Sequence, residues 1–365
     1  MPGAGNAVKR PMSVSVIAGP SAAGVMVGLH ASIGKRFAIF EQGAHSTPQE
    51  IMARLRAIAE KGETDHLIIH CEAERPLMAY AFLFADELAD VSQLTSAAFA
   101  IDSALLLDSL LDRKAMSLSA SFIAEQMEFA SDIFLDGANG PDFELARSIT
   151  TTLNPRAQVS PLTEGDTVAW IDRRGAKFDF DQAINGAGWR KLLDGEQAGG
   201  SDKVTAFAYS ARRPFHPERF SSLLQKGLTG VFRAKGFFWL ATRMDEVGGL
   251  NLAGSELQCS SAGHWWATRD AHLRESEMPA RTRKEWQEPF GDRRQSFAVM
   301  ALSVSREKLQ NQLDGCLLTN DEIAAGEGAW NSFPDPFPSW AHTHEHHHDH
   351  ECDHDHGSHE HDCCG

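Results

Sequence analysis

Six short apolar runs, separated by helix-like segments, constrain the fold of this chain more than any other feature. The runs occupy residues 13–19, 37–42, 66–71, 97–102, 132–137 and 157–162. Residues 48–62, between the second and third runs, begin with Pro and end with Gly, as helices often do. Strands that are apolar without alternation are buried on both faces, and strands that alternate with helices run parallel. We therefore predict an α/β domain with a parallel sheet over residues 13–165, behind a flexible N-terminus at 1–12.

A different pattern follows residues 166–203, which we interpret as a linker because their last part is rich in Gly and polar residues. A helix is predicted from Pro217. The strand-like runs of this region are 204–211, 231–242, 263–269 and 295–303. A last helix is predicted from three leucines spaced four residues apart, Leu309, Leu313 and Leu317. This order predicts a small α+β domain over 204–325, ferredoxin-like in outline.

The C-terminal part, residues 326–365, consists of a Pro- and Trp-containing linker and a tail that begins after Trp340. Residues 341–365 hold ten of the seventeen histidines, seven acidic residues and three of the six cysteines, and they have nothing with which to form a core. Neutral imidazole and thiolate are ligands that zinc and similar ions prefer. The tail is therefore predicted to bind several metal ions. The predicted ligands are His342, His344, His346, His347, His348, His350, Cys352, His354, His356, His359, His361, Cys363 and Cys364.

The net charge of −16 is concentrated towards the same end of the chain. Lys308 is the last basic residue, and twelve of the 50 acidic residues follow it. The remaining chain is close to neutral and has no basic patch, which argues against nucleic acid as a partner. No apolar run approaches the roughly 18 residues of a membrane helix, and no signal-like segment begins the chain. We therefore expect a cytoplasmic protein without a membrane partner.

The first apolar run leads into a glycine-containing loop, 19-GPSAAGVM-26. Gly19 and Gly24 have the spacing of a phosphate-binding loop, G-x-x-x-x-G-K-[ST]. In such a loop the Lys contacts the β- and γ-phosphates, and the Ser or Thr hydroxyl holds Mg²⁺. Val25 and Met26 occupy these two positions here, and they offer neither a charge nor an oxygen ligand. Two glycines alone are a weak signal, so the loop needs support from the rest of the chain.

Several segments together resemble the CobW family, which comprises P-loop GTPases linked to metal handling, many of them zinc chaperones. The segments that carry the resemblance are 207–220, 230–243, 284–286, 293–297, 313–322 and 333–340, with 124–135 and 153–155 in the first domain. The resemblance implies a P-loop NTPase-like domain followed by a CobW C-terminal domain. A His-rich segment is common in this family. The resemblance makes Gly19 and Gly24 a recognisable, vestigial nucleotide-binding loop.

The departures from the family all concern the nucleotide and metal motifs of the first domain. The guanine-reading N-K-x-D should follow the strand that ends at Leu135, but residues 136–139 lack the base-specific Asp. Residues 70–76 have no Thr-Gly pair near the γ-phosphate, and 43–55 lack the C-x-C-C metal motif. The resemblance then implies a GTPase fold that has lost hydrolysis, with no catalytic residues to assign. Weak anion binding at the helix start after Gly24 is retained, whereas Mg²⁺-GTP binding is not expected.

Some single residues outside the tail also have a structural and a functional interpretation. Arg233 and Lys235 alternate with apolar neighbours and are interpreted as the solvated face of a strand, with contact to the first domain as the alternative. His216 is expected to close the turn before the helix from Pro217 rather than to bind metal. The cysteines outside the tail, Cys71, Cys259 and Cys316, are expected to be structural.

Two functions from different classes follow from these patterns. The first is a zinc-binding metallochaperone or zinc-storage protein, which passes its ion to a client metalloprotein or to an intact CobW-family paralogue. Other divalent transition metals fit the same ligands. The alternative is a divergent GTPase that inserts metal into a client metalloenzyme. A third candidate is an adaptor whose second domain docks on the client.

Overall fold

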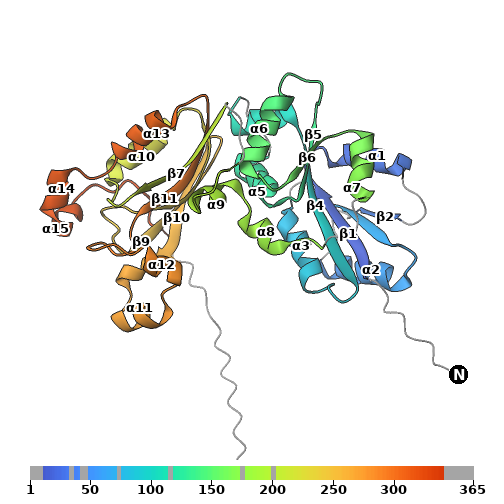
Figure 1. Ribbon diagram of the computed structural model, residues 1–365, viewed down its shortest axis with the longest axis horizontal. Helices are drawn as coiled ribbons and strands as arrows, with labels where there is room; N and C mark the ends of the chain where they lie inside the picture. Colours follow the sequence, from blue (N-terminus) through green and yellow to red (C-terminus); the bar gives the residue numbers. More distant parts are fainter. Residues whose placement is uncertain are drawn as a thin grey trace, which may run out of the picture.

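The computed structural model describes residues 11–32, 37–41, 48–71, 75–113, 118–172, 177–198 and 203–340. Two sheets, one in each half of the chain, organise these residues, and short helices lie between them (Figure 1). Across the ranges described, no helix has both the length and the apolar character needed to cross a bilayer.

The first sheet has six parallel strands in the order β2-β3-β1-β4-β5-β6. The strands are β1 (Met12–Ala18), β2 (Phe37–Glu41), β3 (His66–His70), β4 (Ser92–Asp102), β5 (Asp132–Asp136) and β6 (Gln158–Pro161). Each predicted apolar run overlaps one of these strands, with bounds that agree to within about a residue except at the start of β4. The prediction of a parallel sheet is therefore confirmed.

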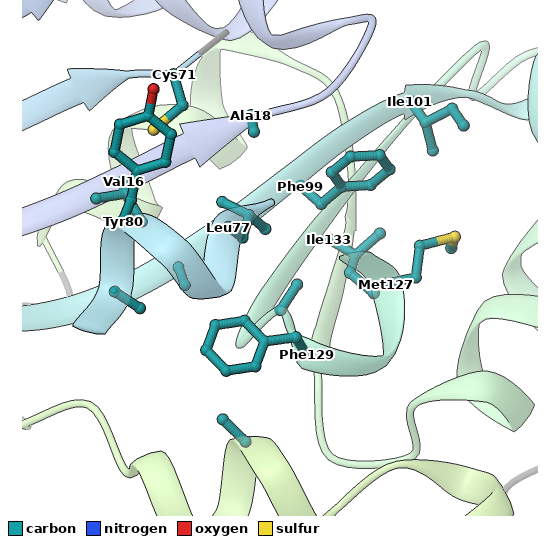
Figure 2. Packing of buried hydrophobic residues seen from close by; sticks show 14 of the residues in the cluster. Val16, Ala18, Cys71, Leu77, Tyr80, Phe99, Ile101, Met127, Phe129 and Ile133 are labelled. Atoms are coloured by element: carbon teal, nitrogen blue, oxygen red, sulfur yellow. The ribbon is translucent and has the colours of Figure 1, made fainter. Parts of the chain in front are cut away.

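Helices cover both faces of this sheet, which explains why its strands are continuously apolar. The helices are α1 (Ala22–Ser32), α2 (Pro48–Lys61), α3 (Leu77–Ala85), α4 (Ser103–Leu110), α5 (Ala120–Phe129) and α6 (Phe143–Leu153). In β1, Val16 packs with α2 to α6, while the next residue, Ile17, packs with α1 on the opposite face. Figure 2 shows part of the larger cluster, in which Phe99 of β4 and Met127 of α5 take part.

The segment predicted as a linker contains three helices instead, α7 (Glu164–Asp172), α8 (Phe180–Asn185) and α9 (Gly188–Leu193). Helix α7 covers the first sheet beside α1, and Trp170 lies in the same apolar cluster as Val25. Helix α8 begins with a cap, because the Asp179 carboxylate accepts a hydrogen bond from the Gln182 amide. Helices of six residues show too little periodicity for the sequence to reveal them. Among the described residues of the segment, 177–179, 186–187 and 194–198 lack regular structure.

The second sheet has five antiparallel strands in the order β10-β9-β8-β11-β7. The strands are β7 (Val204–Ala211), β8 (Val231–Phe238), β9 (Glu246–Ala253), β10 (Glu256–His264) and β11 (Gln295–Leu302). The helices are α10 (Pro217–Lys226), α11 (Ala271–Glu277), α12 (Ala280–Lys284), α13 (Arg306–Asp314), α14 (Asn320–Ala325) and α15 (Glu327–Trp330). Strand β11 lies between β7 and β8, so β7, α10 and β8 form a split β-α-β unit.

Two details of the second domain differ from the prediction. The run 263–269 does not continue as a strand, because β10 ends at His264 and Trp266–Thr268 form a 3₁₀ helix. The Asp292 carboxylate accepts hydrogen bonds from the Trp266 and Ala267 amides, which fixes this turn. Leu317 is not on the last predicted helix, because α13 ends at Asp314.

The two sheets share one apolar cluster. Phe232 of β8, Ala253 of β9 and Met300 of β11 pack in the same cluster as the residues of α2 to α6. The other face of the second sheet packs on α10 and α13 around Phe220 and Leu309. A contact of this kind resembles a domain interior more than a transient interface, so the two halves are joined as one unit.

Candidate functional site

The loop after β1 is a tight turn rather than an open phosphate cradle. Helix α1 begins at Ala22, so Gly24 lies in its first turn instead of preceding it. The amides of Ser21, Ala22 and Gly24 donate to the carbonyls of Ala100, Gly19 and Ser21, at 3.0, 3.1 and 3.0 Å. These amides therefore already donate hydrogen bonds to carbonyl groups of the loop and of β4. In a phosphate-binding loop, backbone amides of this kind point at the ligand.

Both glycines of the loop have a packing role. Gly19 has φ +108°, and a Cβ added there would lie 2.3 Å from the Ala100 carbonyl oxygen, so only glycine fits against β4. A Cβ on Gly24 would lie 3.2 Å from Leu162, and one on Gly28 would lie 3.1 Å from the Thr167 hydroxyl. Gly24 and Gly28 thus allow α1 to approach the segment that contains α7.

Val25 and Met26 point into the core. Val25 is fully buried and Met26 is 3% exposed. Both pack with Ile17, Ala100 and Trp170 between α1 and the sheet. The two positions at which a P-loop carries its Lys and its Mg²⁺-binding hydroxyl are therefore part of an apolar cluster. A charged side chain introduced there would lose its water without gaining a partner.

At the carboxyl ends of β4 and β5, the polar side chains bind the local backbone. The Asp102 carboxylate accepts from the Leu105 amide at 2.9 Å and caps α4. The Asp136 carboxylate accepts from the Gly137 amide at 2.7 Å, while the Ser103 hydroxyl donates to the Asp136 carbonyl at 2.6 Å. Asn139 is exposed. These contacts stabilise turns, and in parallel sheets this edge is where ligands usually bind.

The cysteines and His216 have the surroundings of structural residues. Cys71 is buried, and burial raises the pKa of the Cys259 and Cys316 thiols to about 11. His216 occupies the N-cap position of α10 without a side-chain capping bond, and its ring stacks on Phe333 at 4.5 Å between centroids. Burial and the nearby Arg219 lower the pKa of His216, so its ring is neutral near pH 7.

The thirteen predicted metal ligands of the tail lie outside the described residues. Within the part of the chain that is described, no group of three or more His, Cys, Asp or Glu side chains is placed to hold a metal ion. Residues 42–47 and 72–74, which include parts of the family's C-x-C-C and γ-phosphate segments, also fall outside it. Metal binding by the tail therefore stays a prediction.

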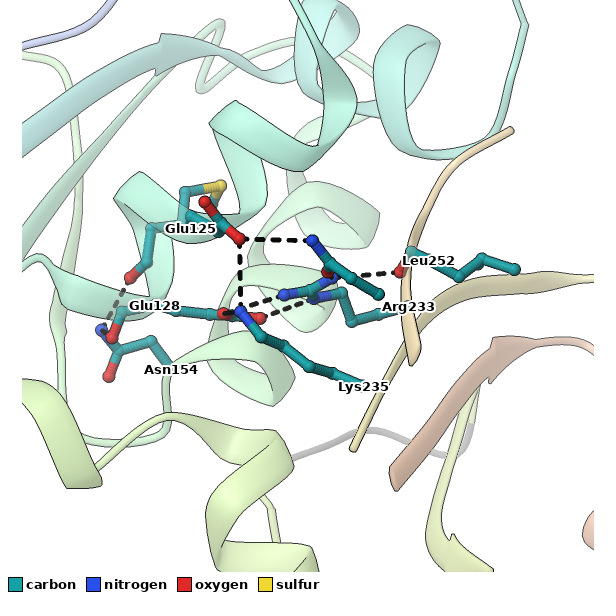
Figure 3. A network of polar contacts seen from close by, with 8 residues as sticks. Glu125, Glu128, Asn154, Arg233, Lys235 and Leu252 are labelled. Atoms are coloured by element: carbon teal, nitrogen blue, oxygen red, sulfur yellow. Dashed lines mark hydrogen bonds and ion pairs between the residues drawn. The ribbon is translucent and has the colours of Figure 1, made fainter. Parts of the chain in front are cut away.

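The interpretation of Arg233 as a solvated residue is wrong, and its alternative, contact with the first domain, is correct. Arg233 is fully buried, and its Nε and Nη2 donate to the two carboxylate oxygens of Glu128 on α5 at 2.6 and 3.0 Å (Figure 3). Its Nη1 also donates to the Leu252 carbonyl at 3.1 Å. Lys235 follows on the same strand, with Nζ 3.3 Å from Glu125 and 3.8 Å from Glu128.

A second residue from the antiparallel sheet binds the other end of α5. The Glu256 carboxylate, on β10, accepts from the amides of Ala120 and Ser121 at 2.8 and 3.1 Å and from the Ser119 hydroxyl. Burial opposes ionisation of Glu256, but these hydrogen bonds hold its pKa below the usual value. The first domain thus receives a helix cap from the second. Sequence spacing gives no signal for this contact, because the partners are 136 residues apart.

Known proteins match either the second domain alone or most of both domains. The family model of the cobalamin synthesis protein cobW C-terminal domain matches residues 204–317. Zinc-regulated GTPase metalloprotein activator 1 of Dictyostelium discoideum is 28% identical over 317 residues, which is 79% of this chain and 67% of that protein. Zinc chaperone Rv0106 of Mycobacterium tuberculosis is 37% identical over 141 residues, 38% of this chain and 35% of that protein.

Among solved structures, this chain is similar to the Zn(II)-bound YjiA GTPase from E. coli. The sequences are 12% identical, the match covers 85% of this chain and 100% of that chain, and the TM-score is 0.35, too low to carry weight for fold or function. The sequence matches are stronger, since one covers the second domain and another runs through most of both domains. Residues 204–317 are therefore a CobW C-terminal domain, and the similarity to a zinc-regulated GTPase metalloprotein activator extends over most of the chain.

Proposed function

We propose that this protein handles zinc without hydrolysing GTP, and that the ion is cargo bound by residues 341–365. The observation that supports the absence of GTP hydrolysis is the burial of Val25 and Met26 in the apolar cluster beneath α1. Phosphoryl transfer depends on positioned charges around the phosphates. In this chain, core residues replace both the Lys that contacts the phosphates and the Ser or Thr that holds Mg²⁺.

The backbone of the loop supports the same conclusion. The Ser21, Ala22 and Gly24 amides are already bonded within the protein, so a phosphate would have to displace those contacts. Loss of the Lys and the Mg²⁺ ligand removes several kcal/mol of transition-state stabilisation, on the order of the 3–4 kcal/mol seen for single oxyanion donors. Turnover of a nucleotide at this loop is therefore not expected.

The names of the relatives support zinc as the cargo. One is a zinc-regulated GTPase metalloprotein activator, and another is a zinc chaperone. Ten histidines and three cysteines in 25 residues provide the ligand types that zinc prefers. In this proposal the tail gives up its ion to a client metalloprotein or to an intact CobW-family paralogue, and other divalent transition metals compete for the same ligands.

Zinc binding by the full chain and by a chain that ends at Trp340 tests the role of the tail. Equilibrium dialysis followed by elemental analysis should give several zinc ions per full chain and a near-complete loss in the truncated one. A full-length variant with the ten tail histidines replaced by Asn keeps the acidic charge and should also lose most of the zinc. Equal zinc binding by the full and truncated chains would contradict the proposal.

The alternative is a divergent GTPase, which the name of the Dictyostelium relative and the glycine loop at the carboxyl end of β1 favour. A titration with labelled GTP and Mg²⁺, followed by measurement of phosphate release, separates the two functions. We expect neither micromolar affinity nor turnover above background. Micromolar binding with turnover would overturn the interpretation of Val25 and Met26 and establish the alternative.

A further inference from the structure

A cavity of about 560 Å³ lies in the second domain, between α11, α12 and the loop that leads to β11. Arg274, Arg283 and Arg293 line it together with Trp286 and Met278. The cavity is far in sequence from the glycine loop, and no function discussed above uses it.

Two guanidinium groups of this cavity bind carbonyl oxygens and have no ion pair among the described residues. Arg274 donates to the Ala267 carbonyl at 3.2 Å, and Arg283 donates to the Glu275 carbonyl at 2.9 Å. Within the described part of the chain, neither has a carboxylate oxygen within 4 Å. Arg281 and Arg294 of the same region, in contrast, form ion pairs at 2.6 and 2.5 Å.

Arg293 is the third cation of the cavity, and its side chain is 13% exposed. Its Nε donates to the Met244 carbonyl at 2.6 Å, and the nearest carboxylate, that of the largely exposed Asp245, is 3.9 Å away. Burial lowers the pKa of Arg293 from its usual value. Partial desolvation without a close counter-ion makes an added anionic ligand favourable.

Two carboxylates also line the cavity, and neither forms an ion pair with these arginines among the described residues. Glu288 accepts a hydrogen bond from the Trp286 indole at 2.8 Å, and Glu275 is exposed. The cavity therefore keeps cations that are available to a ligand. Its apolar wall, including Met278 and Trp286, is suited to a side chain with a flat or aliphatic body.

The last described residues contact a segment that also binds the wall of this cavity. The Arg243 guanidinium pairs with Asp335, donates to the Phe337 and Pro338 carbonyls, and lies 4.2 Å from the centre of the Trp340 ring. Met244, the next residue after Arg243, provides the carbonyl that binds Arg293. The point at which residues 341–365 leave the described structure is thus connected to the wall of the cavity through two consecutive residues.

We propose that this cavity is the docking site of the chain's own tail, residues 341–365, in its metal-free, anionic form. The tail has seven acidic residues and no Lys or Arg, whereas the cavity has three arginines, of which Arg293 alone forms an ion pair among the described residues, with the exposed Asp245 at 3.9 Å. A segment of 25 residues reaches about 80 Å when extended, so length does not limit docking. Tethering gives an effective concentration on the order of millimolar, which makes weak ion pairs sufficient.

Zinc controls the docking, and this part alone depends on the proposed function. Each Zn²⁺ adds two positive charges to a segment with seven acidic residues, and its ligands gather the tail around the ion. Both effects weaken attraction to the arginines. The loaded tail is then released from the second domain and becomes accessible to a receiving protein.

A fluorescent peptide of residues 341–365, followed by anisotropy, tests docking against the chain that ends at Trp340 and against the full chain. The truncated chain should bind the peptide, and the full chain should bind it at least tenfold more weakly because its own tail occupies the cavity. A peptide with its seven acidic residues replaced by Asn and Gln should not bind. Equal binding of the neutral peptide, or equal binding by the two chains, would overturn the proposal.

Variants of the truncated chain locate the site. Arg274→Gln with Arg283→Gln should weaken binding about five- to tenfold, which is about 1–1.4 kcal/mol in total for the loss of two exposed ion pairs. Arg274→Lys with Arg283→Lys keeps the charge and should retain most of the affinity, which separates charge from folding defects. Arg147→Gln, in the first domain and paired with Glu144, is the matched control and should have no effect. Equal loss in the Gln and Lys variants would contradict docking by charge.

To test the effect of zinc, the anisotropy titration is repeated with the same peptide in the presence and absence of a saturating amount of Zn²⁺. A loss of affinity of tenfold or more supports metal-controlled release. If the peptide binds zinc but its affinity for the cavity does not change, the proposed function stands and the metal-controlled docking is refuted. If the peptide binds no zinc while it still docks, the proposed function fails and the docking site remains.

Discussion

The carboxyl-end edge of the parallel sheet and the face of the same domain that meets the second sheet use polar residues in opposite ways. At the edge, the glycine loop closes on itself and the positions that would serve a nucleotide are apolar. At the interdomain face, Glu125, Glu128 and the start of α5 bind Lys235, Arg233 and Glu256. The polar side chains of the interdomain face therefore stabilise the junction with the CobW C-terminal domain, whereas those at the edge stabilise only the turns of the first domain.

The largest expected effect comes from placing a charge at the edge. Val25→Lys would restore a P-loop residue by sequence, but the position is fully buried. We expect a loss of about 3–5 kcal/mol in the free energy of unfolding, as for an unpaired buried charge, and no gain in GTP affinity. Ala23→Lys, at an exposed position of the same helix, should be close to neutral. Urea denaturation and a GTP titration measure the two effects. GTP binding by a stable Val25→Lys variant would show that the edge still accommodates a nucleotide and would contradict the difference between the edge and the interdomain face.

A similar effect is expected when the interdomain pair is cut on one side. Arg233→Met leaves the 6%-exposed Glu128 carboxylate with only Lys235 at 3.8 Å, and should cost about 3 kcal/mol of stability. The double variant Arg233→Met with Glu128→Leu removes both charges and should recover most of that loss. Chemical denaturation of the unchanged protein, the double variant and both single variants, Arg233→Met and Glu128→Leu, gives the coupling energy. Equal stabilities of the single and double variants would show that the charges are not coupled.

The cap that Glu256 gives to α5 should have a smaller effect. Glu256→Ala leaves the Ala120 and Ser121 amides without their acceptor, and should cost about 1 kcal/mol, the usual value for a lost N-cap. Gln258→Ala, at an exposed position of the same strand, is the control. Hydrogen exchange should also become faster in the first turn of α5. Unchanged exchange there would mean that the helix does not need the second domain.

The smallest effect is expected at a pair that lies wholly within the second domain. Two hydrogen bonds from Arg219 to Glu322, at 2.8 and 2.7 Å, hold the pKa of Glu322 at about 2, below its usual 4.5. Because the folded-state pKa is depressed, the stabilisation is present above about pH 4.5 and is lost as the pH falls towards 2.

Glu322→Gln keeps the capping-box geometry at the start of α14 and removes the charge. It should cost less than about 1 kcal/mol at pH 6, and the difference from the unchanged protein should disappear near pH 2. Thermal unfolding across this pH range provides the measurement. A difference that stays constant with pH would refute the role of the charge.

The sequence predicted the parallel sheet well because each strand is buried on both faces and leaves an uninterrupted apolar run. It did not reveal β9 and β10, since Glu246–Ala253 contains two glycines and Glu256–His264 is largely polar. The run with Trp265 and Trp266 resembled a strand, yet its conformation is set by Asp292, whose position cannot be read from the local sequence.

The candidate site was predictable only where it depends on residue identity. Val25 and Met26 were recognisable as departures from the loop motif, but their burial required the packing of α1 under α7. Arg233 and Lys235 alternate with apolar residues in a way typical of a solvated strand face. In the structure, that face is covered by the first domain. A local sequence pattern does not show whether a strand face contacts water or a carboxylate that is distant in the sequence.

The cap on α5 also sets an order of events during synthesis. Ala120 receives its acceptor from Glu256, which leaves the ribosome 136 residues later, about 7–27 s at typical elongation rates. Throughout that interval the helix has its own Ser119 side chain as cap and lacks the stronger carboxylate. The parallel-sheet domain therefore reaches its final stability only after the strands of the C-terminal domain have emerged, and a nascent chain stalled before Glu256 would carry a frayed α5.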